Sequence, residues 1–182
     1  MRAPRPVSLL LTAVLAACQA EGPVVPSAHD HPVAAVREIA QADLNALRTV
    51  LRPYREVEVA KDAGWNFVIP NTNGELCFHT DAAAMGFHYA QAGLLDGTVE
   101  ASLPEALIYE PRKHGKLRLV AVEYLVPFTA WSSANPPRLY GQDFTPLPAF
   151  GVYGLHVWAE KRNPDGVFAA FNPQVSCAFA DE

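Results

Sequence analysis

The chain has 182 residues, is 50% hydrophobic, and carries 19 acidic and 14 basic side chains, which give a formal net charge of −5. This balance disfavours nucleic acids and anionic lipid headgroups as direct partners, because both are negatively charged. The length is sufficient for one domain of ordinary size with a substantial hydrophobic core.

The first 18 residues predict an exported lipoprotein. Arg2 and Arg5 precede an apolar run over residues 7–17, which is too short to span a bilayer as a helix and has the layout of a secretory signal. The run ends in Leu-Ala-Ala followed by Cys18, which resembles the lipobox of bacterial lipoproteins, where the cysteine is acylated and the peptide before it is removed. We therefore expect residues 1–17 to be a signal peptide. The alternative is an ordinary secretory signal cleaved nearby, with Cys18 incidental.

A lipid on Cys18 would be the protein's contact with the membrane. Two or three acyl chains anchor a protein firmly, because each buried methylene contributes about 0.8 kcal/mol. Gln19, rather than Asp, follows the cysteine, which in Gram-negative lipoproteins resembles the signal for transfer to the outer membrane. Loss of Arg2 and Arg5 with the signal would reduce the 14 basic residues to 12, against 19 acidic ones, a formal charge of −7. We expect a lipid-anchored protein of the bacterial cell envelope, in the outer membrane and facing the periplasm.

Residues 18–31 predict a short lipidated tether, because they are rich in Pro, Ala and Gly and hold little to bury. A single domain should follow over residues 32–182. A His-Asp-His run at residues 29–31 lies in this tether. Such a run can bind a metal ion, but a solvated start to a helix is the favoured interpretation.

An amphipathic helix is predicted at the start of the domain, because apolar residues recur there at every third or fourth position. Pro32 suits its first turn, where a missing N–H costs nothing. Pro53 should kink or restart the helix, since its ring clashes with the preceding turn. A second helical piece should then reach Ala63 and end at Gly64, which suits a C-cap. The apolar positions are Val33, Val36, Ala40, Leu44, Leu47, Leu51 and Tyr54.

After residue 64 the sequence changes to short β-rich runs separated by Pro, Gly and Asn. The clearest hairpin would join residues 106–110 to residues 117–126. A helix followed by mainly hairpin-linked strands predicts an α+β fold, in which the helix packs on a mainly antiparallel sheet. The predicted strands cover residues 65–69, 85–89, 106–110, 117–126 and 152–162. Residues 127–151 combine Pro with aromatic side chains, and such a long loop is either a functional lid or packed down by its own side chains, with packing favoured.

Glu123 stands out within the longest predicted strand. The two-residue period places it on one face with Leu117, Leu119, Ala121 and Leu125, so a carboxylate interrupts an apolar row. An unpaired buried charge is costly, and Glu123 therefore needs a partner. A structural partner would be a histidine, an arginine or a set of buried donors, and this pairing is the favoured outcome; a functional partner would be a metal ion.

The cysteine count indicates one disulfide. With Cys18 assigned to lipid, Cys77 and Cys177 remain, and in an oxidising envelope an even pair is most simply a disulfide. A thiol metal site and a redox pair are the alternatives, but no CxxC spacing supports either. The bond would pin the C-terminal segment onto the middle of the domain.

Several histidines and glutamates could carry chemistry. Neutral imidazole and carboxylate are ligands that Zn²⁺ and similar ions use in proteins, and a three-ligand site leaves an open coordination position. The spacing alone does not define a site, because there is no HExxH, no pair of histidines at helical spacing and no HxH within a strand. For each histidine alone, a hydrogen-bonded structural role is favoured. The residues considered are His79, His88, Glu105, Glu110, Glu123, His156 and Glu160.

Short motifs are spread over about residues 40–177: MGFHY at 85–89, PEALIYE at 104–110, VEY at 122–124, LHVW at 155–158, NPDG at 163–166 and NP at 172–173. This string resembles an uncharacterised family of exported bacterial proteins. The resemblance implies no activity, ligand or cofactor. It does place His88, Glu123 and His156 in the motif segments of that family, which favours a shared site.

Two functional hypotheses follow from the sequence. The first is a non-catalytic binding or interaction module, whose small ligand or envelope-protein partner docks in a pocket under the aromatic loop. The second is a metal-dependent enzyme, with His88, Glu123 and His156 as ligands of a divalent ion such as Zn²⁺ and a nearby carboxylate such as Glu105 as general base. The first requires less to be true and is favoured, and a structural lipoprotein without a ligand is a third option. No GxSxG elbow, Walker loop or GxGxxG run favours another catalytic class.

Overall fold

The computed structural model describes residues 39–182. The expected signal peptide, the lipidated Cys18, the tether with its run at 29–31 and the predicted helix start at Pro32 lie outside the described residues. Within residues 39–182, none of the helices has the length and apolar character needed to cross a bilayer.

The described chain begins with three consecutive helical segments. They are α1 (Gln41–Leu51), the 3-10 helix η1 (Arg52–Arg55) and α2 (Val57–Asp62). The predicted interruption at Pro53 is confirmed, because α1 ends at Leu51 and Pro53 lies at the start of η1, where a missing N–H costs nothing. Ala63 is the C-cap of α2, and Gly64 follows with a φ of 109°, a conformation that glycine adopts without steric cost.

The strands of the described chain form a seven-stranded sheet and a separate two-stranded ribbon. The large sheet has the order β1-β3-β4-β5-β9-β8. Strand β2 also pairs with β3, and the two-stranded ribbon consists of β6 and β7. All pairings among these strands are antiparallel, so the α+β class with a mainly antiparallel sheet is confirmed. The strands are β1 (Phe67–Ile69), β2 (Cys77–His79), β3 (Ala84–Ala90), β4 (Ala106–Arg112), β5 (Lys116–Pro127), β6 (Arg138–Leu139), β7 (Gln142–Asp143), β8 (Thr145–Leu147) and β9 (Val152–Val157). Two further 3-10 turns are η2 (Ala92–Leu94) and η3 (Phe128–Ala130).

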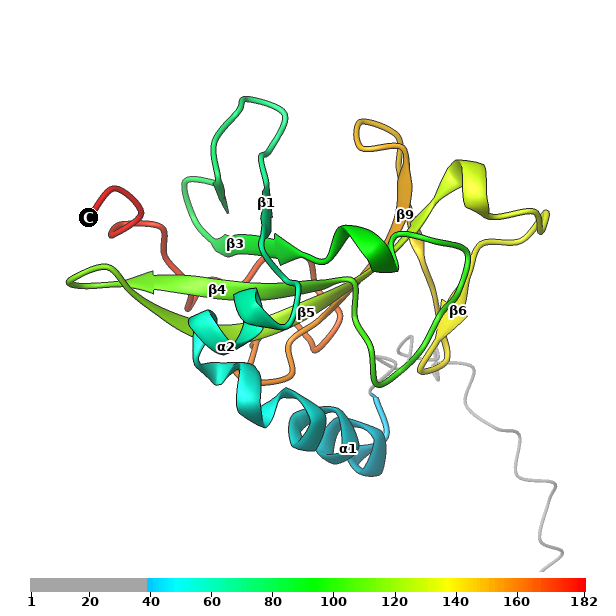
Figure 1. Ribbon diagram of the computed structural model, residues 1–182, viewed down its shortest axis with the longest axis horizontal. Coiled ribbons are helices and arrows are strands. Elements are labelled where there is room, and N and C mark those ends of the chain that lie inside the picture. Colours follow the sequence, from blue (N-terminus) through cyan, green and yellow to red (C-terminus); the bar gives the residue numbers. More distant parts are fainter. Residues whose placement is uncertain (1–38) are drawn as a thin grey trace, which may run out of the picture. The chain divides into compact units, whose positions relative to one another are not determined.

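The helices cover one face of the large sheet (Figure 1). Leu47 and Leu51 of α1 and Ala60 of α2 are buried in one cluster with strand residues that include Tyr109 and Val122. Burying a leucine side chain contributes about 1.5 to 3 kcal/mol. The apolar spacing found in the sequence is therefore what holds the helices on the sheet.

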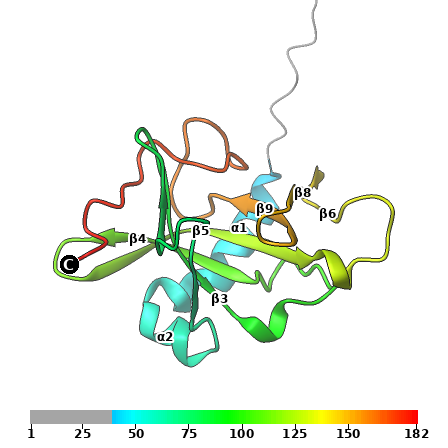
Figure 2. The ribbon, with the colours of Figure 1, turned by 90° about the horizontal axis from the view of Figure 1, so that it is seen from above.

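The opposite face of the sheet is covered in part by the C-terminal segment. Ala121 of β5 is buried there with Trp158 and Val175. Figure 2 shows this segment returning to the turn of the β4–β5 hairpin, where the backbone N–H of His114 donates to Glu182 Oε2 at 2.9 Å. Phe171 of this segment also lines the pocket beside the site described below.

The predicted disulfide is present in the structure. Cys77 in β2 and Cys177 in the C-terminal segment are bonded, with Cα atoms 6.0 Å apart, although 100 residues separate them in the sequence. This distance is within the usual range for disulfides. The bond ties the C-terminal segment to β2, a short strand at the edge of the sheet that pairs with β3.

A bulge in β5 changes the predicted faces of that strand. Two neighbouring residues of β4 pair with Ala121 and Leu119, which leaves Val120 as an extra residue in β5. The alternation of side chains restarts at a bulge. Leu117 and Leu119 therefore pack with the helices, whereas Ala121 and Glu123 face the other way. The prediction that all of these residues share one face was wrong for the two that precede the bulge.

Two other segments differ from the prediction in detail. The aromatic loop contains the β6–β7 ribbon and β8, and Phe144 in it is buried in the core beside the helices, so the loop is packed by its own side chains. The last strand ends at Val157 instead of residue 162. It ends there because the N–H of Trp158 donates to the carbonyl of Val167 at 2.9 Å and no longer to a neighbouring strand.

Candidate metal centre

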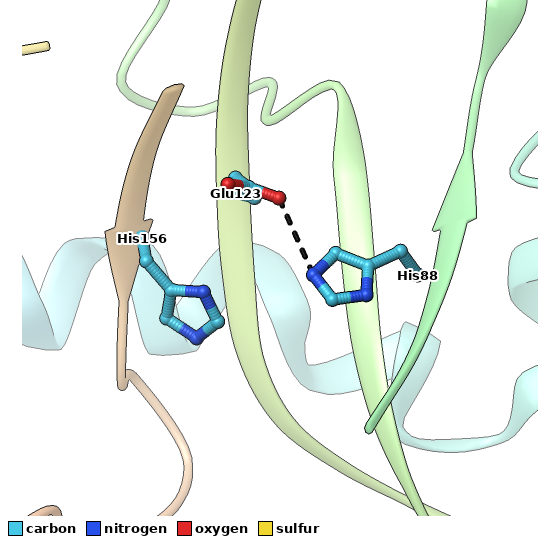
Figure 3. A group of neighbouring side chains, drawn as sticks. All are labelled: His88, Glu123 and His156. Atoms are coloured by element: carbon cyan, nitrogen blue, oxygen red, sulfur yellow. Dashed lines mark ion pairs between the residues drawn. The ribbon is translucent and has the colours of Figure 1, made fainter. Parts of the chain in front are cut away.

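The three residues predicted to share a site lie together on the face of the sheet opposite the helices. They come from three different strands, His88 from β3, Glu123 from β5 and His156 from β9, and their side chains point toward one another (Figure 3). In the ladders, Glu123 is paired with His156 on one side and with Ala106 on the other. Strand β4 thus separates Glu123 from β3, and the short side chain of Ala106 leaves room for Glu123 and His88 to meet above it.

The position of His88 depends on an unusual stretch of β3. Gly86, two residues earlier, has a φ of 113°, and a Cβ at this position would collide with the carbonyl oxygen of Tyr109 on β4. The pairing with β2 also shifts here, because Phe78 pairs with Gly86 but the next residue pairs with Ala84. Only glycine fits such a close approach at positive φ. The glycine of the MGFHY run therefore sets the register that brings His88 to the site.

The distances suit metal coordination. His88 Nε2 and Glu123 Oε2 are 3.3 Å apart, and one ligating atom from each of the three residues lies within 4.8 Å of the other two. Metal bonds of about 2.0 to 2.1 Å in tetrahedral geometry place two ligand atoms about 3.3 Å apart. The distance between His88 Nε2 and Glu123 Oε2 already equals this expected distance between two ligand atoms. The rings of His88 and His156, with centroids 6.3 Å apart, would need a small movement to complete the site.

Several polar atoms at the centre have no partner. Within residues 39–182, neither ring nitrogen of His156 makes a hydrogen bond, and neither does Nδ1 of His88. Both histidines are buried, with exposed fractions of 6% and 2% respectively. An unpaired buried polar group costs about 1 to 3 kcal/mol, and folded proteins rarely keep one without a reason. A metal ion bound to one nitrogen of His156 would give that nitrogen a partner.

The electrostatics favour metal-binding charge states at Glu123 and His156. Burial tends to raise the pKa of the Glu123 carboxyl, but the hydrogen bond and charge of His88, with a smaller contribution from His156, outweigh it and lower the pKa. Burial lowers the pKa of His156 to about 3, although the charge of Glu123 opposes this. At neutral pH the centre therefore offers an anionic carboxylate and a neutral His156. Metal ligands must be deprotonated in this way.

The centre forms part of the wall of a pocket of about 480 Å³. His88 and Glu123 line this pocket, whereas His156 does not. The ring of Phe78 packs on His88 with centroids 4.4 Å apart, and Phe150 lies 6.0 Å from Phe78, so aromatic rings lead from the centre to the rim. The segment around β1 and the turn before β9 rise from the sheet on this side, away from α1 and α2 (Figure 1).

The other residues considered from the sequence do not join this centre. Glu110 pairs with Lys161 at 3.0 Å, and Glu160 pairs with Arg55 at 2.9 Å, so both have structural partners. His79 is exposed and lines the pocket, with Nδ1 3.2 Å from the carbonyl of Cys77. The structure therefore brings three of the seven residues together.

Glu105 does not occupy the position that a general base would need. It lies just before β4, is buried, and accepts a hydrogen bond from the N–H of Leu125 at 2.9 Å. It is absent from the pocket lining and from the group of His88, Glu123 and His156. Glu105 thus has a structural partner, and nothing in the described chain supports it as the general base. The carboxylate instead lies just before the first residue of β4. It accepts from the buried N–H of Leu125 in β5 and so continues the pairing of the two strands.

Replacing Glu105 should change how stability depends on pH. Burial raises the pKa of Glu105 to about 7, although the N–H of Leu125 opposes this. The folded state thus holds a proton more tightly than the unfolded chain, so this contribution to stability is complete below about pH 4.5 and is lost as the pH rises through about 7. Glu105→Gln keeps an acceptor for Leu125 without a charge. At pH 8 it should stabilise the fold by up to roughly 3 kcal/mol in chemical denaturation.

The control for this experiment is Glu56→Gln, which alters an exposed glutamate at the start of α2. That variant should follow the wild-type pH profile. Equal pH profiles for the wild type and Glu105→Gln would contradict the account of Glu105.

Sequence reasoning missed two small residues that shape the centre, Ala106 and Gly154. A Cβ at Gly154 would lie 2.7 Å from Leu147 Cδ1 and 3.1 Å from Glu123 Oε1, so glycine leaves space for the carboxylate. A glycine inside a strand is a known signal for a close approach. The signal was present in the sequence, but the partner was not visible without the register.

Comparison with protein-family models, with curated proteins and with solved structures found no match to this chain. The resemblance of the motif string to a family of exported proteins therefore remains an expectation. What can be said of the site rests on its own geometry and chemistry.

Proposed function

We propose that this domain binds one divalent metal ion of the Zn²⁺ type through His88, Glu123 and His156, and that it acts as a binding module of the cell envelope. The observation that carries the proposal is the convergence of three ligating atoms within 4.8 Å, at a place where both nitrogens of a buried histidine lack partners in the described chain. Two imidazoles and one carboxylate form a ligand set that zinc uses in proteins.

A simple ion pair explains the centre less well than a metal does. The 3.3 Å between His88 and Glu123 is long for a charge-assisted hydrogen bond, which is usually about 2.7 to 2.9 Å. An ion pair would also leave His156 without a role. A metal ion would use all three residues and would balance the charge of Glu123.

Binding is favoured over catalysis because, among the described residues, the pocket lacks a second carboxylate, and its remaining histidine, His79, is exposed and has Nδ1 3.2 Å from the carbonyl of Cys77. Three protein ligands leave a coordination position open, as in catalytic zinc sites. Hydrolysis at such a site also needs a base near the metal-bound water. Among residues 39–182, Glu123 is the only acidic residue that lines the pocket, and it is already assigned to the metal. We therefore propose a module that holds a ligand at the metal.

The proposed location rests on Cys18. We expect the mature protein to be acylated on this residue and held in the outer membrane. Cys18→Ala should abolish acylation and membrane retention, with no change in the melting temperature of the folded domain, because the anchor comes from lipid alone. Membrane fractionation and intact mass of the mature chain would check this. An unmodified N-terminus at any other residue would contradict it.

Zinc titration of the metal-free mature protein tests the proposed function. Calorimetry should give one ion per chain. Glu123→Gln should weaken binding by about a hundredfold, since four-ligand sites bind with about 10 to 16 kcal/mol, or roughly 3 kcal/mol for each ligand.

His114→Asn is the matched control for the titration. It removes an exposed histidine in a turn, and asparagine tolerates its φ of 64°. It should bind zinc as the wild type does. Absence of zinc binding, or equal binding by Glu123→Gln, would contradict the proposal.

A further inference from the structure

The pocket beside the centre is lined mainly by apolar side chains, and its polar members besides His88 and Glu123 are Asn71, Thr72, Asn73 and His79. Its aromatic members are Phe67, Phe78, Phe150 and Phe171, and its aliphatic members include Leu95, Leu125, Leu147 and Val152. Phe67 and Phe150 are 52% and 39% exposed, although such large side chains are usually buried more fully. Pockets of about 300 to 1,000 Å³ with mainly apolar walls and a few polar groups are typical of small-molecule sites. The pocket of about 480 Å³ is in this range.

The charged groups of the pocket all lie at one end, where the proposed metal centre is. Among the described residues that line it, Glu123 is the only acidic side chain, and there is no lysine or arginine. With a divalent ion bound, one carboxylate and two neutral imidazoles leave a net charge of +1. A positive charge at the end of an apolar pocket favours a ligand that has one negative charge at one end and an apolar body.

The arrangement of the three residues favours a ligand that reaches the metal from the pocket. His88 and Glu123 line the pocket, whereas His156 lies beside Glu123 on the neighbouring strand and is not part of the lining. A position left open by these three would therefore face the pocket. The rings of Phe78 and Phe150 continue from His88 toward the rim and would lie along the body of the ligand.

We propose that the metal-loaded protein binds a monocarboxylate with an apolar body, whose carboxylate takes the open coordination position and whose body lies against Phe78 and Phe150. This inference rests on the proposed metal binding. A phosphate group fits less well, because its second charge would have no lysine or arginine in the pocket to meet it. A sugar fits less well because ten of the sixteen lining residues are apolar, although Asn71, Thr72, Asn73 and His79 could meet some of its hydroxyl groups.

Octanoate is a suitable probe, because it joins one carboxylate to an apolar chain. Zinc binding is measured first, by calorimetry on the mature protein. The zinc-loaded protein is then titrated with octanoate, with acetate, which has the charge without the body, and with octanamide, which has the body without the charge. We expect octanoate to bind at least about tenfold more tightly than either, a difference of about 1.4 kcal/mol. The metal-free protein should bind octanoate at least about tenfold more weakly than the zinc form.

A pair of variants locates the site. Phe150→Ala should leave zinc affinity unchanged and weaken octanoate binding about fivefold, because it removes apolar contact area at the rim. Phe179→Ala removes an aromatic ring outside this pocket and should change neither affinity. Zinc binding without preferential octanoate binding would overturn this inference and leave the metal site standing. Octanoate binding of equal strength without zinc, or in Phe150→Ala, would also overturn it. Absence of zinc binding would instead contradict the proposed function itself.

Discussion

His156→Leu should make the metal-free protein more stable and at the same time remove its high-affinity zinc site. Leucine fills a similar volume, and it removes two buried ring nitrogens that have no partner within the described chain. Each unpaired buried polar group costs about 1 to 3 kcal/mol, so the melting temperature of the metal-free form should rise by several degrees. Loss of one of three ligands should weaken zinc binding by at least about a hundredfold. A residue that improves stability when it is removed is one kept for function.

Two measurements make this expectation specific. Zinc at a hundred times its Kd should stabilise the wild type by about 2.7 kcal/mol, and it should leave the melting temperature of His156→Leu unchanged. His114→Asn should respond to zinc as the wild type does. If His156→Leu proves less stable than the metal-free wild type, His156 is a structural residue and the account of the centre is wrong.

Removal of the Cys77–Cys177 disulfide should be the largest purely structural loss. In the chain-entropy model, a bond that closes a loop of this length contributes about 4 to 5 kcal/mol, although measured values are often smaller. The bond also holds the C-terminal segment, which packs Trp158 and Val175 against the sheet. The double variant Cys77→Ala, Cys177→Ala should lower the melting temperature by roughly 10 °C or more.

Reduction of the wild type should reproduce this effect, and the same reductant should leave the double alanine variant unchanged. Two free thiols titrating in the folded, freshly purified protein would contradict the bond. Equal melting temperatures for oxidised and reduced protein would contradict its contribution to stability.

The parts of the fold that could be predicted from sequence are those set by local chemistry. Pro53 interrupts the helix because of its own ring, and Gly64 follows α2 because it tolerates positive φ. The longer strands could be predicted because their apolar residues alternate with a period of two or form a continuous run in the sequence. The disulfide followed from counting, since only two cysteines remained once Cys18 was assigned to lipid.

The parts that could not be predicted depend on contacts between distant segments. The bulge at Val120 exists because of pairing with β4. The residues near it give no sequence signal that the following side chains will point to the opposite face of the sheet. Short strands such as β2 and β8 are held by their neighbours and have little pattern of their own. Glu105 could not be told from a catalytic carboxylate, because its partner is a backbone N–H twenty residues away, on Leu125.

The candidate centre lies between these two cases. The interruption of an apolar row by Glu123 indicated that a partner was needed, and the histidines were its plausible partners. The convergence itself depends on register: His156 is paired with Glu123 across β5 and β9, and His88 reaches it over Ala106. The pocket depends on how β1 and the turn before β9 rise from the sheet, which has no local signature.

X-ray absorption at the zinc edge, on the mature protein loaded with one ion per chain, tests the central claim most directly. The account predicts two imidazole nitrogens and one carboxylate oxygen at about 2.0 to 2.2 Å, with one further light atom in the open position. One imidazole should disappear from the spectrum of His156→Leu loaded at high zinc concentration, and both should remain in His114→Asn. A shell without imidazole in the wild type, or the same shell in His156→Leu, would contradict a metal centre formed by His88, Glu123 and His156.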